Sequence, residues 1–74
     1  MHICVKLFAG FREGRFKEAR QEYPPGTDCR TIVKELSLTE GQLGIILVNN
    51  CHARLPKVLE EGDTLSLFPL IGGG

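Results

Sequence analysis

Apolar and polar residues alternate over the first segment of the chain, residues 2–9. Because successive side chains of a strand point to opposite faces, this pattern predicts a strand with one core-facing side. Residues 16–23 are mostly charged or polar, which is typical of an exposed edge strand. In the first strand, the predicted core face holds Ile3, Val5 and Leu7, and the partly polar opposite face holds Cys4, Lys6 and Phe8.

A single apolar stripe predicts one helix after the turn at Pro24-Pro25-Gly26. Either Thr27 or Asp28 caps its first turn. Because the stripe packs against a sheet, Cys29 is predicted to be a buried core thiol rather than a nucleophile. The stripe follows the spacing i, i+3, i+4 and i+7 of an amphipathic helix and consists of Cys29, Ile32, Val33 and Leu36.

The rest of the chain predicts three further strands. The uninterrupted apolar run of residues 45–48 indicates a central strand buried on both faces. Residues 37–44 form a connection with room for one helical turn, and residues 51–55 follow the turn signal Asn49-Asn50. Residues 64–68 form the last strand, after the turn at residues 61–63. The order β-β-α-β-β-β predicts an α+β fold, a mixed sheet with one main helix packed across it, as in the β-grasp or ubiquitin-like roll. The same pattern also leaves other small α+β folds open.

Composition excludes several classes of function. The 74-residue chain has no net charge, and its basic residues are dispersed, so we expect no nucleic-acid partner. The longest apolar run is too short to span a membrane, and the N-terminus has no signal-peptide pattern, so we expect a cytoplasmic protein. The three cysteines form no CxxC motif, so we expect reduced thiols and no metal site.

The chain ends in three consecutive glycines, which predict a β-grasp domain over residues 1–71 and a flexible tail over residues 72–74. Glycine has no Cβ, so these residues make a thread without side-chain width. Such a thread can enter a narrow cleft of another protein and present its carboxylate there. A frayed terminus without function is the alternative interpretation.

Several segments together resemble the MoaD/ThiS sulfur-carrier proteins, closest to the small subunit of molybdopterin synthase. The resemblance covers nearly the whole chain, and its most specific part is a turn, a strand, Phe-Pro and a terminal diglycine in succession. The segments that carry it are KLFAGFRE at residues 6–13, PGT at 25–27, ILVNN at 46–50, LEEGD at 59–63 and LFPLIGGG at 67–74.

The resemblance implies a mechanism at the C-terminus. An E1-like adenylyltransferase, using ATP and Mg²⁺, adenylates the Gly74 carboxylate, and a persulfide sulfur donor then converts it to a thiocarboxylate. Gly73 and Gly74 match the family's diglycine, whereas Gly72 lies at a more variable position. The chain is then a sulfur-carrying cosubstrate rather than an enzyme, possesses no cofactor of its own, and serves as the small subunit of a synthase complex.

By the same resemblance, Phe8, Phe68 and Gly72 are expected to bind the partner proteins. Ordinary core positions are the alternative for both rings, and Arg12 is either structural or part of the interface. Cys51 and His52 are adjacent, but neighbouring strand residues point to opposite faces, which argues against a catalytic pair.

Several functions remain open within and beyond this family. The residues 6–13 segment and Phe68-Pro69 favour molybdopterin (molybdenum or tungsten cofactor) synthesis, with the synthase large subunit as partner. The short connection before residue 45 is closer to the thiamine carriers, whose partner is thiazole synthase. A second class of function is a ubiquitin-like protein modifier conjugated to lysines, and a third is a plain interaction module with an idle tail.

Overall fold

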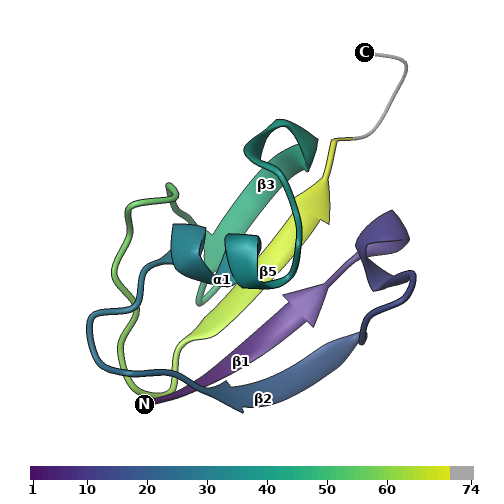
Figure 1. The fold of residues 1–74 in the computed structure, drawn as a ribbon. Helices are drawn as coiled ribbons and strands as arrows, with labels where there is room; N and C mark the ends of the chain where they lie inside the picture. Colours follow the sequence, from purple (N-terminus) through teal and green to yellow (C-terminus); the bar gives the residue numbers. More distant parts are fainter. Residues whose placement is uncertain (71–74) are drawn as a thin grey trace.

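The computed structural model describes residues 1–70, which form a five-stranded mixed sheet with one α-helix across one face (Figure 1). The strands are β1 (His2–Leu7), β2 (Glu18–Glu22), β3 (Leu43–Val48), β4 (Cys51–His52) and β5 (Thr64–Pro69). The helix α1 spans Cys29–Glu35, and two 3₁₀ turns, η1 (Ala9–Arg12) and η2 (Glu40–Gln42), complete the fold.

The order of the strands across the sheet is β2-β1-β5-β3-β4. The first and last strands, β1 and β5, pair in parallel, and every other neighbouring pair is antiparallel. The strand β5 therefore occupies the centre, and the polar strand β2 lies at an edge, as its composition predicts. This arrangement is the predicted α+β, β-grasp roll.

The core lies between the sheet and α1. It consists of the alternating apolar residues of the strands and the apolar stripe of the helix, as predicted. Ile3, Val5 and Leu7 of β1 are fully buried on the face that α1 covers. The helix turns its own apolar stripe toward them, and Cys29 is buried there as predicted. Asp28 is the N-cap, because its Oδ1 accepts a 2.9 Å hydrogen bond from the Thr31 backbone N–H.

The prediction that residues 45–48 are buried on both faces is wrong. Val48 is buried on the helix side, but Ile45 is 43% exposed. The central position belongs to β5, and β3 has only the two-residue strand β4 beyond it. Nothing within residues 1–70 covers the face of the sheet opposite α1, so an uninterrupted apolar run here marks an exposed surface as well as a core.

A tight turn joins β3 and β4 at the end of the sheet where β5 begins. Asn49 and Asn50 both have positive φ, 52° and 67°, and form the two-residue turn between β3 and β4. The buried Asp63 accepts hydrogen bonds from the Asn49 side chain and the Glu60 backbone, each 2.9 Å long. These bonds fix the turn to the start of β5.

The predicted tail, Gly72, Gly73 and Gly74, and the predicted domain boundary after Ile71 lie outside the described residues. Among residues 1–70, no helix is long and apolar enough to cross a membrane.

Candidate functional site

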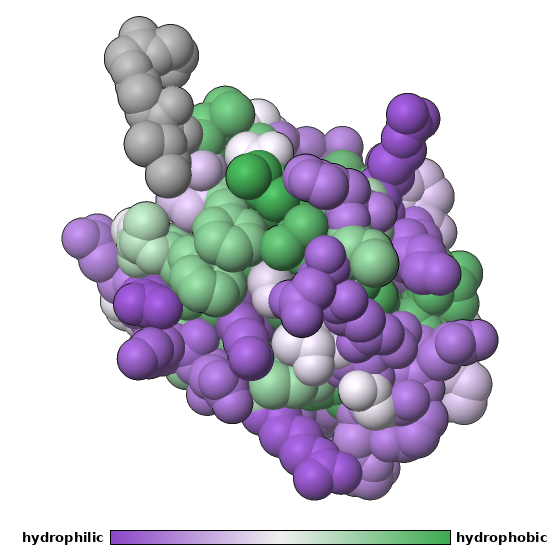
Figure 2. Space-filling view, turned by 180° about the vertical axis from the view of Figure 1, so that it is seen from behind, coloured by the Kyte–Doolittle hydropathy of each residue, from purple (hydrophilic) through white to green (hydrophobic). Residues whose placement is uncertain are grey.

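The sheet has an inner face under α1 and an outer face that the described chain leaves uncovered. The strand registers place Ile45 directly beside Phe68, and Leu47 beside Ser66, on the outer face. Phe8 follows Leu7 of the inner face, so it also points outward. We call these four apolar residues, Phe8, Ile45, Leu47 and Phe68, the apolar platform. Figure 2 shows apolar side chains gathered on this face, with polar side chains around them.

The two predicted partner-binding aromatics lie in direct contact at the centre of the platform. The rings of Phe8 and Phe68 stack with centroids 4.1 Å apart and an interplanar angle of 9°. Both rings are half-buried, so neither belongs to the buried core. Stacking of this kind stabilises an aromatic pair by about 0.5–1.5 kcal/mol beyond area burial. The stack therefore presents part of its apolar surface to solvent.

Arg12 fixes the Phe8 ring from the side of η1. Its guanidinium carbon lies 5.3 Å from the ring centroid, a cation–π distance. Its Nε donates a 2.7 Å hydrogen bond to the Leu7 carbonyl oxygen. These contacts give Arg12 a structural role and place its guanidinium beside Phe8 of the platform. A role of Arg12 at the interface stays a prediction.

The platform lies next to the place where the described chain ends. Phe68 is followed by Pro69, the last residue of β5, and the Leu70 N–H donates a 2.9 Å hydrogen bond to the Gln42 carbonyl oxygen. Gly44 of β3 allows this close approach, because a Cβ there would lie 2.7 Å from the Pro69 carbonyl oxygen. The backbone leading toward Gly74 is thus anchored beside the apolar platform.

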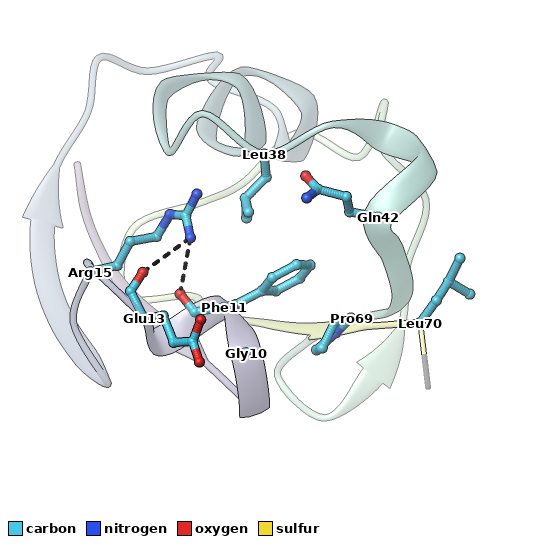
Figure 3. Close-up of a pocket in the computed structure, with 8 residues that line it drawn as sticks. All are labelled: Gly10, Phe11, Glu13, Arg15, Leu38, Gln42, Pro69 and Leu70. Atoms are coloured by element: carbon cyan, nitrogen blue, oxygen red, sulfur yellow. Dashed lines mark hydrogen bonds between the residues drawn. The ribbon is translucent and has the colours of Figure 1, made fainter. Parts of the chain in front are cut away.

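A hollow of about 440 Å³ lies on the other side of this exit, and the side chains of Phe11 and Leu38 point into it (Figure 3). Arg15 borders the hollow, and its Nε donates a 2.9 Å hydrogen bond to the Leu36 carbonyl oxygen. Its Nη1 makes longer hydrogen bonds, of 3.4 and 3.5 Å, to the backbone of Phe11 and Glu13. Arg15 thereby ties η1 to the segment after α1 and holds the end of the sheet together.

The three cysteines lie apart. Burial raises the pKa of the Cys29 thiol to about 11, and the Asp28 charge adds to this shift. Cys51 and His52 are exposed and pair with Val48 and Leu47, so their side chains point to opposite faces as predicted. Within residues 1–70, no cluster of histidine, cysteine, aspartate and glutamate residues could hold a metal ion.

In a comparison with known protein families, the ThiS family model matches residues 5–74. The chain belongs to the ThiS family. Members of this family are ubiquitin-like sulfur carriers, as the resemblance predicts. A search of curated protein sequences finds no match.

Several solved structures share this fold. A Pyrococcus furiosus protein described as molybdopterin converting factor, subunit 1, is 26% identical, with a TM-score of 0.78 over 96% of this chain and 99% of that one. Subunit 1 of the Helicobacter pylori molybdopterin-converting factor, solved in complex with subunit 2, is also 26% identical, with a TM-score of 0.67 and full coverage of both chains. SAMP1 from Haloferax volcanii is 23% identical over both full chains, with a TM-score of 0.77, and shows the same fold.

Sequence reasoning identifies two of the four platform residues. It predicts that Phe8 and Phe68 face a partner, whereas it assigns Ile45 and Leu47 to the core. The missed signal is the shared phase of the two runs: once β3 lies antiparallel to β5, every second residue of both strands points to the outer face. Partner binding by Phe8, Phe68 and Gly72 stays a prediction.

Proposed function

We propose that this ThiS-family chain carries sulfur on its C-terminal carboxylate for molybdopterin-type cofactor synthesis. The observation that supports this best is the position of the apolar platform. Residues 1–70 leave it uncovered, and its residue Phe68 belongs to the central strand β5, which precedes the C-terminal glycines in the sequence. A partner that covers the platform is thereby positioned to receive the last residues of the chain.

In this proposal the chemistry takes place at Gly74 and not at a side chain. A carboxylate is a poor electrophile, so an E1-like enzyme first adenylates it with ATP and Mg²⁺. The terminal sulfur of a persulfide donor then displaces AMP and gives an acyl disulfide. A second thiol attacks the donor's sulfur, which releases the thiocarboxylate and leaves the donor in a disulfide. The thiocarboxylate transfers sulfur to an acceptor bound by another protein. The chain contributes no general acid or base. It is a cosubstrate, binds no cofactor itself, and supplies the platform and a tail narrow enough to enter both partner sites.

Two solved relatives above 25% identity favour the molybdopterin assignment. Both are described as subunit 1 of a molybdopterin converting factor, and one was solved with its subunit 2. By analogy, the partner that accepts sulfur from this chain is the large subunit of a molybdopterin synthase. The Phe68-Pro69 sequence at the end of β5 agrees with this assignment.

Thiazole synthesis for thiamine is the second candidate function. Two observations favour it: the short connection between α1 and β3, which contains only the single 3₁₀ turn η2, and the description of the matching family. Sulfur transfer from the loaded chain to a molybdopterin synthase large subunit, compared with transfer to a thiazole synthase, distinguishes the two pathways. A ladder of isopeptide-linked cellular proteins would instead identify a protein modifier.

Gly73→Val tests the proposed chemistry. A β-branched side chain widens the thread, so we expect ATP–pyrophosphate exchange by the activating enzyme to fall to background. Gly41→Val is the matched control, because a Cβ at Gly41 meets nothing within 4 Å. It should support exchange at the wild-type rate. Undiminished exchange with the Gly73 variant would contradict activation through a narrow cleft.

A further inference from the structure

A small notch with an excess of positive charge borders the apolar platform on the side of β1 and β2. Its volume is about 220 Å³. Three cationic side chains and one carboxylate line it, together with one edge of the Phe8 ring. The lining residues are Lys6, Phe8, Arg12, Lys17 and Glu18.

The backbone brings these charges together from three elements. Lys6 of β1 lies opposite Glu18 of β2, so both point to the outer face. The Leu7 N–H donates a 2.9 Å hydrogen bond to the Lys17 carbonyl oxygen, which places Lys17 just beyond that pair. Arg12 enters from η1, where its stacking on Phe8 holds it in place.

The cations of the notch form no close ion pair within the described chain. Within residues 1–70, no carboxylate oxygen lies within 4 Å of the charged nitrogens of Lys6, Arg12 or Lys17. Even Glu18, which lines the notch, makes no such ion pair. The chain as a whole has zero net charge, so this excess is a local feature of the platform's margin.

We propose that the notch receives an acidic side chain of the activating enzyme and so fixes the angle at which the domain docks. The inference rests on the proposed function. Apolar contact is not directional, so the platform alone allows the domain to rotate on its partner. A charged contact at the rim sets the register of an interface and guides the encounter. Only one orientation directs Gly74 toward the adenylation site.

Continuity of the surface identifies the occupant as a protein side chain. Phe8 belongs both to the platform and to the notch, so a partner surface that covers the stacked rings also covers the notch. Arginine offers a planar fork that matches a carboxylate, and the Arg12 Nε is already engaged with Leu7. Its terminal nitrogens are therefore the donors directed to the partner.

The test measures how the rate of ATP–pyrophosphate exchange depends on the concentration of the chain, with the activating enzyme of the source organism. In Lys17→Glu we expect KM for the chain to rise roughly three- to tenfold at low salt, because the charged contact is lost. We also expect kcat to fall, because a domain free to rotate also docks in orientations that do not direct Gly74 to the adenylation site. Lys6→Gln should raise KM less. Both effects should shrink at high salt, because screening shortens the range of exposed charges to about 3 Å at 1 M.

Two further variants separate this contact from a general effect of charge. Lys34→Glu makes the same change in net charge on α1, on the opposite side of the sheet, and should leave KM unchanged. Glu18→Gln removes the carboxylate that repels an acidic partner, so KM should fall about twofold. Arg12 is left intact because it also supports Phe8, and urea denaturation checks that each variant is folded.

The outcomes distinguish the two proposals. Equal KM values for Lys17→Glu and Lys34→Glu would overturn the proposed role of the notch, and so would a KM for Glu18→Gln above that of the wild-type chain. Either result leaves the proposed function intact. A wild-type chain that supports no exchange overturns the proposed function, and the notch with it.

Discussion

Leu67 and Phe68 are consecutive residues of β5, yet they lie in opposite environments. Leu67 faces α1 and has no exposed surface, whereas Phe68 faces outward and is half-buried against Phe8. Two consecutive residues of β5 thus belong to different surfaces, one to the core and the other to the apolar platform. The inner face holds the domain together, and the outer face remains available to another protein.

The comparison shows how a chain of 74 residues serves two purposes with one sheet. A domain of this size is marginally stable, so most of its apolar residues must be buried under the single helix. The apolar platform on the outer face has no helix over it, and an exposed apolar surface lowers solubility unless a partner binds it. The proposed docking accounts for an exposed apolar surface at the strand that precedes the C-terminal glycines, whereas folding alone does not require one.

The largest effect on stability is expected from Leu67→Ala. Removing a fully buried leucine side chain leaves a cavity and should lower the free energy of unfolding by about 2–5 kcal/mol. Phe68→Ala, one residue further, should cost only about 1 kcal/mol, mainly the lost stacking. It should nevertheless raise KM for the chain in ATP–pyrophosphate exchange at least as much as the notch variants do. Urea denaturation and exchange assays measure the two effects, and equal stability losses would refute the distinction between the faces.

A smaller effect on stability is expected from Gly44→Ala, which changes how β3 aligns with the end of β5 beneath the apolar platform. The new Cβ would lie 2.7 Å from the Pro69 carbonyl oxygen, so β3 and the end of β5 must move apart. We expect a loss of about 1–3 kcal/mol in the free energy of unfolding, as for other overpacked sites. Gly41→Ala, where a Cβ meets nothing within 4 Å, is the control and should be neutral. Equal denaturation midpoints for the two variants would mean that the approach of β3 to Pro69 is not tight.

The mildest test changes no residue and uses the cysteines as reporters. Under iodoacetamide at about pH 8, exposed Cys51 should react first and half-buried Cys4 of the outer face next. Cys29 should react only as fast as the domain unfolds, because it is buried and its pKa is raised to about 11. Peptide mapping over time measures the order. The neutral thiol's contribution to stability is present below its ordinary pKa of 9.0 and is lost as the pH rises through 11.

Local patterns predict the inner face well. The alternation of Ile3, Val5 and Leu7 and the helical stripe around Cys29 each depend on a period within one element, and the structure confirms both. The outer face depends instead on pairing between distant segments. The stack of Phe8 on Phe68 requires the parallel register of β1 and β5, which are joined by most of the chain. The pattern of residues within either strand does not predict that register.

The error at residues 45–48 has the same origin. A run of apolar residues shows that both faces of a strand are apolar, but it does not show what covers them. Here the inner side of β3 meets the core at Val48, and its outer side carries Ile45 into solvent. The role of Arg12 is also beyond sequence reasoning, because its two contacts come from the fold of η1 over β1.

The central place of β5 has a mechanical consequence. This strand is held by β1 on one side and by β3 on the other, and it is the strand from which the C-terminal end departs. Traction applied to that end along the strand loads the hydrogen bonds on both flanks simultaneously in shear, because they run across the strand axis. Resistance to shear is shared among all these bonds, whereas peeling breaks them one at a time. A protein that binds the end of the chain and then releases it is therefore not expected to pull β5 out of the sheet.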